Sequence, residues 1–168
     1  MADLTKEQHI ENINKVIKGV KYAMMTTITA DEKHLHACPM TTNKNELENG
    51  KIWFIGDRKS ETIKDLEKNS QVNLSYTSSD QKDFVSINGT AKLVNDKAKL
   101  DELWSPIYAA FYEKGKEDPN VQVICIECNG AQYWLSGNTV VDMFKMVSAA
   151  VQEGKTAENL GENHSVTF

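Results

Sequence analysis

The sequence of 168 residues predicts an α+β protein that is mainly β, built on an antiparallel sheet or barrel with flanking helices. About six stretches have strand composition, and the first five follow one another with only one short helix among them. Helical patterns otherwise stand near the start, late in the chain and near its end. A doubly wound parallel sheet needs a helix after each strand, so this order favours strands joined by turns.

Composition indicates one soluble globular domain and excludes several classes of protein. The chain is 40% apolar and 26% charged, and its net charge of −5 argues against wholesale binding to nucleic acid or to an anionic membrane. No apolar run resembles a signal peptide or is long enough to span a bilayer, so we expect a cytoplasmic protein. Three cysteines are too few for a disulfide scaffold and indicate reduced thiols.

The first quarter of the chain predicts a helix and a hairpin. Thr5 and Gln8 form a capping box ahead of an amphipathic helix. The segments 20–29 and 34–42 are rich in Thr and aliphatic residues and predict two paired strands. Asn49-Gly50 is a strong turn signal that leads directly into the next strand.

The segment 51–76 is the centre of the functional prediction. It predicts a strand over 51–55, a basic loop, a helix over 61–68 and a strand over 72–76. A helix N-terminus offers unpaired N–H groups and a partial positive charge, which suit an anion such as phosphate. The alternative is a capped surface helix with ordinary surface charges. The residues that favour the anion site are the N-cap Ser60, the hydroxyl of Thr62, and the basic side chains of Arg58 and Lys59.

The second half alternates helices and strands. The segments 83–87 and 90–94 flank Asn88-Gly89, which fits either a hairpin turn or a bulge in one longer strand, because Gly supplies the positive φ that each needs. Asp96 caps a helix that Pro106 is expected to kink or break near Trp104.

Strands are expected over 121–128 and 131–135, with a turn at Asn129-Gly130 between them. A final helix is expected over 140–154, followed by a loose polar tail over 155–168.

Common catalytic and metal-binding signatures are weak in this chain. Cys125 and Cys128 have CxxC spacing, but residues three apart on a strand point to opposite faces and do not share a metal. His34 and His36 share a strand face without an evident third ligand, so we interpret them as rim residues rather than a metal site. Cys38 has no evident partner base and is interpreted as a buried or interface thiol. The dinucleotide, nucleotide and hydrolase motifs are missing from the sequence.

Aromatic residues and methionines exceed what a small core requires, which a flat cofactor or a subunit interface would explain. Several of these residues lie in motifs that extend over nearly the whole chain: Met25-Thr26-Thr27, Leu35-His36-Ala37-Cys38-Pro39-Met40, Gly50-Lys51-Ile52-Trp53-Phe54, Val72-Asn73-Leu74-Ser75-Tyr76, Val85-Ser86-Ile87-Asn88-Gly89-Thr90-Ala91, Glu102-Leu103-Trp104-Ser105-Pro106 and Ala131-Gln132-Tyr133-Trp134. Their order and spacing resemble the general stress protein group of the pyridoxamine 5'-phosphate oxidase-like split-barrel superfamily, which includes FMN-binding homodimers.

The resemblance implies a six-stranded antiparallel split β-barrel over residues 1–154 that dimerises and holds FMN in a cleft between subunits. It implies three groups of site residues. Met40, Thr41, Trp53, Phe54 and Ile55 would line the isoalloxazine or ribityl portion, Arg58, Lys59, Ser60 and Thr62 would surround the phosphate, and Trp104, Tyr133 and Trp134 would form a cleft wall or the dimer contact.

Three positions depart from the family pattern. The family usually has Arg where this chain has Cys38, often Thr at the position of Gly56, and Lys at the position of Thr62. Two cationic phosphate ligands are therefore replaced, and we expect Arg58, Lys59 or Lys64 to compensate.

The function implied by the resemblance is a flavin-dependent oxidoreductase that acts on a small organic acceptor or takes electrons from NAD(P)H. The alternatives are a non-catalytic flavin-binding stress protein and a cofactor-free split-barrel dimer that has lost its affinity for FMN.

Overall fold

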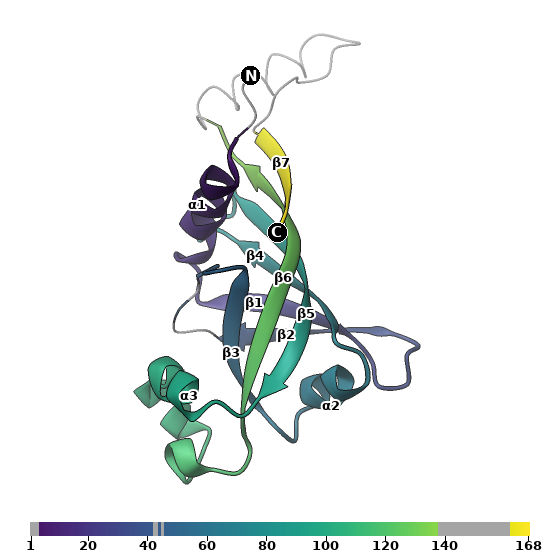
Figure 1. The fold of residues 1–168 in the computed structure, drawn as a ribbon, viewed down its shortest axis with the longest axis vertical. Helices are drawn as coiled ribbons and strands as arrows, with labels where there is room; N and C mark the ends of the chain where they lie inside the picture. The colour runs from purple at the N-terminus through teal and green to yellow at the C-terminus, as the bar shows by residue number, and fades with distance from the viewer. Residues whose placement is uncertain (1–3, 42–43, 45, 138–161) are drawn as a thin grey trace.

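Seven strands, three α-helices and two short 3₁₀ helices make up the described part of the chain in the computed structural model (Figure 1). The structure describes residues 4–41, 44, 46–137 and 162–168. In chain order the elements are α1 (Lys6–Ile17), β1 (Tyr22–Ile28), β2 (Leu35–Thr41), β3 (Lys51–Asp57), α2 (Glu61–Lys68), β4 (Gln71–Thr77), β5 (Phe84–Val94), α3 (Lys97–Leu103), η1 (Pro106–Ala110), η2 (Gly115–Glu117), β6 (Val121–Leu135) and β7 (Glu162–Thr167).

The strands form one antiparallel sheet in the order β2-β1-β4-β5-β6-β3, and β7 pairs with β6. The two end strands of this path, β2 and β3, contact each other without forming a ladder. The sheet therefore curls into a barrel that stays open between β2 and β3. This is the split antiparallel barrel that the sequence predicts.

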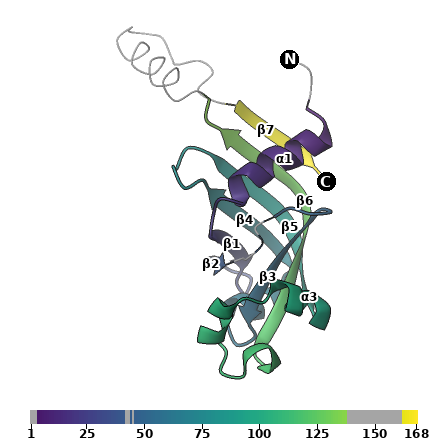
Figure 2. The ribbon, with the colours of Figure 1, turned by 90° about the vertical axis from the view of Figure 1, so that its left-hand side faces the viewer.

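Helices close the two ends of the barrel. Figures 1 and 2 show α1 at the end that carries β7, and α3 at the opposite end. Ile13 and Ile17 of α1 and Ile63 of α2 are buried in the main core together with alternate residues of the strands. A second, smaller core lies around α3 and η1 and includes Ile55 and Tyr108. No helix among the described residues is apolar and long enough to cross a membrane.

Local signals in the sequence are confirmed at several element ends. Thr5 and Gln8 exchange both bonds of a capping box, with distances of 3.3 and 2.8 Å. Ser60 caps α2 by accepting the Ile63 N–H at 3.3 Å, and α2 has the predicted bounds. Helix α3 ends at Leu103, and two residues separate it from the 3₁₀ helix that begins with Pro106, as expected from the proline.

Three expectations for the second half need correction. First, Asn129-Gly130 is not a turn, since β6 runs without a break from Val121 to Leu135. Gly130 instead allows close approach of β7, because a Cβ there would lie 2.9 Å from the Val166 carbonyl oxygen.

Second, the tail is not loose over 162–167, since these residues form β7 along an edge of β6 that β3 leaves uncovered. Third, the positive φ expected at Asn88-Gly89 is wrong, since neither residue has one, whereas the bulge in a continuous strand, one of the two predicted alternatives, is confirmed in β5. The expected helix over 140–154 lies outside the described residues.

Candidate functional site: a cavity at the split of the barrel

A cavity of about 270 Å³ lies where the sheet is open. Its walls come from the two end strands β2 and β3, the start of α2, one residue of β6, and the aromatic segment at η1. The lining residues are Cys38, Pro39, Met40, Thr41, Ile55, Gly56, Asp57, Ser60, Thr62, Ile63, Tyr108, Phe111, Tyr112 and Ile124.

The floor of the cavity is apolar, and the absence of a side chain at Gly56 keeps space open there. A Cβ on Gly56 would lie 3.1 Å from Ile124 Cδ1, 3.5 Å from Ile63 Cδ1 and 3.7 Å from Met40 Cε. The glycine therefore leaves room where four segments of chain converge, and Met40 Cε fills part of the same space. Cys38 lies two residues from Met40 on β2, and the two sulfur atoms are 3.8 Å apart. The result is a soft, polarisable wall along β2.

An aromatic cluster forms the opposite wall. The Trp104 ring lies 5.6 Å from the ring of Tyr108 and 6.1 Å from that of Tyr112, both in tilted geometry. The Tyr108 hydroxyl donates a hydrogen bond to the Thr41 carbonyl oxygen at 3.3 Å, which ties this wall to β2. Phe111 lies at the mouth with 75% of its surface exposed. The aromatic wall is thus anchored on its inner side and apolar on its outer side.

The loop before α2 uses most of its own N–H groups. The Arg58 N–H donates to the Asn120 carbonyl oxygen at 2.7 Å, and the Ser60 N–H donates to the Asp57 carbonyl oxygen at 2.9 Å. The Lys59 N–H donates to Asp57 Oδ1 at 2.8 Å. Within the described hydrogen bonds, the first turn of α2 keeps the N–H groups of Glu61 and Thr62 for a ligand.

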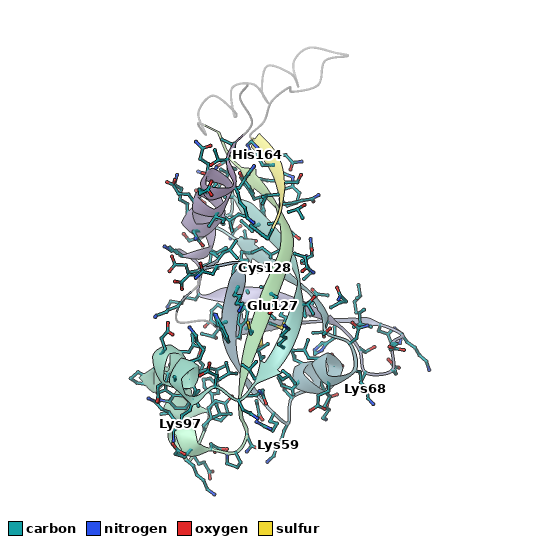
Figure 3. All side chains as sticks on the ribbon, in the orientation of Figure 1. Lys59, Lys68, Lys97, Glu127, Cys128 and His164 are labelled. Carbon is teal, nitrogen blue, oxygen red and sulfur yellow. The ribbon has the colours of Figure 1, made fainter. Side chains whose placement is uncertain are left out.

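Charge at the cavity is negative. Asp57 belongs to the lining, whereas Arg58 and Lys59 do not, and all three residues are exposed. In Figure 3, Lys59 lies at the lower edge of the molecule. Burial, with a smaller contribution from the Asp57 charge, raises the pKa of Tyr112 to about 12, so its hydroxyl keeps its proton near neutral pH.

The structure brings five of the twelve predicted site residues together on the cavity: Met40, Thr41, Ile55, Ser60 and Thr62. Phe54 is buried in the main core, and Trp53 and Trp104 belong to the second core behind the aromatic wall. Tyr133 and Trp134 lie on the half of β6 that pairs with β7. The Tyr133 ring is buried there, with its hydroxyl 2.7 Å from His9 Nδ1.

Sequence reasoning did not assign Asp57, Tyr108, Tyr112 or Ile124 to the site. Ile124 lies opposite Phe54 in the β3–β6 ladder, and this register is not readable from either strand alone. Tyr108 and Tyr112 are four residues apart, a spacing that by itself is typical of one face of a helix and does not point to a cavity. Their place at the cavity follows from the break at Pro106, which sends the chain back toward β2.

The donor set of this cavity fits most of a flavin. The sulfur, aliphatic and aromatic walls suit a flat apolar ring, and the hydroxyls of Thr41, Ser60 and Thr62 suit a polyol chain. For a terminal phosphate the described lining residues provide hydroxyl and N–H donors, and none of them has a basic side chain. The fit is therefore good for the ring and the polyol and weaker for the phosphate.

The antiparallel barrel that is open between β2 and β3, with a cavity at the opening, defines this chain as a split-barrel protein before any comparison with relatives. Comparison then identifies the family, since residues 8–157 match the model for "Pyridoxamine 5'-phosphate oxidase like" proteins. The chain belongs to this family, and its relatives place it in the general stress protein group.

Three relatives illustrate the relationship. A general stress FMN/FAD binding protein from Xanthomonas citri is 30% identical, with a TM-score of 0.65, covering 78% of this chain and 90% of that one. General Stress Protein 26 from Bacillus anthracis has the same fold at 23% identity and a TM-score of 0.65, covering 74% of this chain and 92% of that one. Protein bli-3 from Neurospora crassa is 26% identical over 164 residues, covering 93% of this chain and 78% of the relative.

Proposed function

We propose that this protein binds FMN in the cavity between β2, β3 and η1 and acts as a flavin-dependent oxidoreductase. The observation that carries the proposal is the apolar, hydroxyl-edged cavity on which five residues predicted from the sequence converge. The FMN/FAD binding relative from Xanthomonas citri supports the flavin, as does membership of the pyridoxamine 5'-phosphate oxidase-like family.

In this proposal the chain positions the cofactor and shields it. Met40 and Ile55 contact the ring from β2 and β3, and Tyr108 covers it from η1. The hydroxyls of Ser60 and Thr62 bind the ribityl chain near the start of α2, with Arg58 and Lys59 closer to solvent. A bound flavin supplies hydride and single-electron transfer, for which the protein needs no catalytic acid or base.

Flavin binding is tested by titrating the purified protein with FMN and following flavin fluorescence. We expect saturable quenching, and we expect Tyr108→Ala to weaken binding by about tenfold or more because it removes one wall of the cavity. The matched control is Ile107→Ala on the same segment, since Ile107 is 54% exposed and does not line the cavity. No quenching at excess FMN, or a folded Tyr108→Ala variant with unchanged affinity, would contradict the proposal.

Turnover separates an enzyme from a flavin-storage or sensing protein. The flavin-loaded protein is mixed with NADH or NADPH, and bleaching of the flavin is followed by stopped flow before a small acceptor is added. Repeated reduction and reoxidation support the oxidoreductase. A bound flavin that neither donor reduces supports the non-catalytic alternative.

We also propose that the protein is a homodimer formed through the outer face of the sheet. One row of paired residues crosses six strands on this face, in the order Pro39, Met24, Ser75, Ser86, Gln132 and Ser165. The outward residues of β1, β2, β4 and the first half of β5 carry no charge: Tyr22, Met24, Thr26, Ile28, Leu35, Ala37, Pro39, Thr41, Gln71, Asn73, Ser75, Thr77, Phe84, Ser86 and Asn88.

An uncharged face of this size is unusual in a chain that is 26% charged with a net charge of −5. In a two-fold contact each residue meets the same surface of its partner, so a face without charges avoids self-repulsion. Exposed Met and aromatic residues such as Met24, Phe84 and Trp134 are also typical of interface centres. The occupant that fits this face is therefore a second copy of the chain.

Light scattering coupled to gel filtration tests the dimer. We expect a dimer mass for the unmodified protein and a shift toward monomer for Met24→Glu, because a charge at the centre of the face would meet its own copy. Ile107→Glu is the control, since Ile107 is exposed and lies outside the face. A monomer at all concentrations, or a Met24→Glu variant that stays dimeric, would rule out this interface.

The proposed location of the protein is the cytoplasm. The three cysteines, Cys38, Cys125 and Cys128, are free thiols, and two of them are buried. Thiols remain reduced in that compartment, so this state supports the proposal. Fractionation of cells that express the tagged chain tests it, and recovery from a secreted fraction would contradict it.

A further inference from the structure

Three basic side chains lie near the start of α2, and the structure shows why they add little charge inside the cavity. Lys64 Nζ lies 2.6 Å from Glu61 Oε1, so its charge is already compensated on the surface of the helix. Arg58 and Lys59 are exposed, and neither belongs to the lining. Charges in water are screened over about 8–10 Å at physiological salt, so exposed cations attract a ligand in the cavity only weakly.

Among the described residues that line the cavity, the charged one is Asp57, which is exposed and has the same sign as a phosphate. Its carboxylate also occupies the Lys59 N–H at 2.8 Å, a donor that would otherwise be available to an anion at this loop. Together with the bonds of Arg58 and Ser60 to carbonyl oxygens, this leaves the Glu61 and Thr62 N–H groups as the backbone donors without a described partner in the segment 58–63. A phosphate therefore finds two backbone donors and an adjacent carboxylate.

At the opposite end of the cavity, the described lining residues place no carboxylate near the ligand. Met40, Ile55, Ile124 and the tyrosine wall are uncharged at neutral pH. Affinity for a flat ring follows from this apolar contact and is independent of what terminates the ribityl chain.

From these observations we infer that the cavity recognises the ring and polyol of a flavin and discriminates little between FMN and riboflavin. Asp57 is exposed like Arg58 and Lys59, but of these three residues it is the one on the lining, so it sets this specificity: its charge lies nearest the ligand and offsets the attraction of the helix N-terminus and the two basic residues. This inference rests on the proposed flavin site and widens its ligand class from a flavin phosphate to flavins with or without the phosphate.

The test is a pair of fluorescence titrations of the full chain, one with FMN and one with riboflavin, at the same salt concentration. We expect dissociation constants that differ by less than tenfold. FMN binding tighter by tenfold or more would overturn the inference and leave the proposed flavin site standing. If neither ligand quenches, the proposed site and this inference fail together.

The variant Asp57→Asn isolates the charge, since an amide oxygen still accepts the Lys59 N–H. We expect FMN to bind this variant about three- to tenfold more tightly and riboflavin to bind it unchanged. The matched control is Asp31→Asn in the β1–β2 hairpin, where Asp31 Oδ1 accepts the Lys33 N–H at 3.2 Å in the same kind of turn, away from the cavity. Equal effects of Asp57→Asn on both ligands, or no effect on FMN, would remove Asp57 from the proposed role.

Discussion

Asp65 holds helix α2 against the β1–β2 hairpin from inside the molecule, and the carboxyl is only 3% exposed. It accepts hydrogen bonds from Thr27 Oγ1 at 2.8 Å, from the Ala30 N–H at 2.9 Å and from His36 Nδ1 at 3.0 Å. Burial acts to raise the pKa of Asp65, but these donors outweigh it, so the pKa lies below its ordinary value. His36, which the sequence suggested as a rim residue, is thus the partner of a buried acid.

The first prediction concerns the donor from β1. Thr27→Val keeps the shape of a side chain that is 1% exposed and removes the hydroxyl bond to Asp65. We expect a loss of about 1–3 kcal/mol in the free energy of unfolding at neutral pH, because a buried acceptor loses its partner. Chemical denaturation measures this loss.

The same variant makes a prediction about pH. A depressed carboxyl pKa stabilises the fold above the ordinary pKa of Asp, and this contribution is lost as the pH falls through the lower, folded-state value. Thr27→Val raises the folded-state pKa of Asp65 toward its unfolded value, so the variant loses less stability on acidification and completes that loss at a higher pH. Thr29→Val is the control, since Thr29 donates to the exposed Asp31, and we expect a much smaller change. Identical acid profiles for Thr27→Val and the unmodified protein would contradict this account.

Gly89 gives a second prediction at the scale of one residue. The expectation that positive φ explains this glycine is wrong, and the structure shows instead a close approach of β6 to the bulge. A Cβ at Gly89 would lie 2.7 Å from both the Glu127 carbonyl oxygen and Ile126 Cγ2. We therefore expect Gly89→Ala to lower the unfolding free energy by about 1–3 kcal/mol, as overpacking does.

The control for Gly89→Ala is Gly19→Ala, where the nearest atom to the new Cβ is the Val16 carbonyl oxygen at 3.7 Å. This variant should be neutral or slightly stabilising, because alanine restricts the unfolded chain. Equal stability of the two variants would show that the bulge has room for a side chain.

At the scale of the elements, three Asn-Gly pairs show what sequence can and cannot predict. Asn49 and Gly50 have φ values of 51° and 71° and form the predicted turn before β3. Asn88-Gly89 and Asn129-Gly130 lie inside continuous strands instead. The dipeptides are locally identical, and the pairing of long strands with distant partners determines which of them turn.

The candidate site also contains residues that the sequence could predict and residues that only contacts between distant segments bring to it. The capped helix α2 is a local pattern, so Ser60 and Thr62 were predictable from the residues themselves, whereas Met40, Thr41 and Ile55 were assigned to the site through the family resemblance. Tyr108 and Tyr112 reach the cavity from a segment more distant along the chain, through a hydrogen bond from Tyr108 to the Thr41 carbonyl oxygen and ring contacts with Trp104. Such contacts between distant segments leave no periodic signal in the sequence.

Strand β7 provides the prediction at this scale. β3 covers β6 over Val121–Glu127, and β7 covers it over Gly130–Leu135 on the part that β3 leaves open. Val166 and Phe168 of the same segment pack against the main core. A chain that ends at residue 161 should therefore lose about 2 kcal/mol of unfolding free energy, as expected for two half-buried apolar side chains.

Hydrogen exchange locates the effect of this truncation. Amides of 130–135 should lose protection, whereas amides of 121–127 retain their partner strand β3 and serve as the internal control. Unchanged protection over 130–135 would show that β7 does not stabilise this edge.

The whole molecule carries a net charge of −5, which bears on how a charged flavin approaches it. Asp57 lies on the cavity lining, and Arg58 and Lys59 lie just outside it, so their opposite charges offset one another at short range. At long range the net negative charge of the whole molecule repels the FMN phosphate. Riboflavin has no charge and does not respond to that field.

The final prediction is therefore a salt dependence of the two association rate constants. The screening length is about 30 Å at about 0.01 M salt and about 3 Å at about 1 M, so high salt removes the repulsion. We expect the ratio of the FMN to the riboflavin association rate constant, measured by stopped-flow fluorescence, to rise with salt. A phosphate captured by Arg58 and Lys59 would give the opposite slope, with FMN association slowed by salt, and the riboflavin rate is the control for salt effects on the ring contacts. The sign of this slope thus distinguishes a site steered by its loop cations from one governed by Asp57 and the charge of the whole protein.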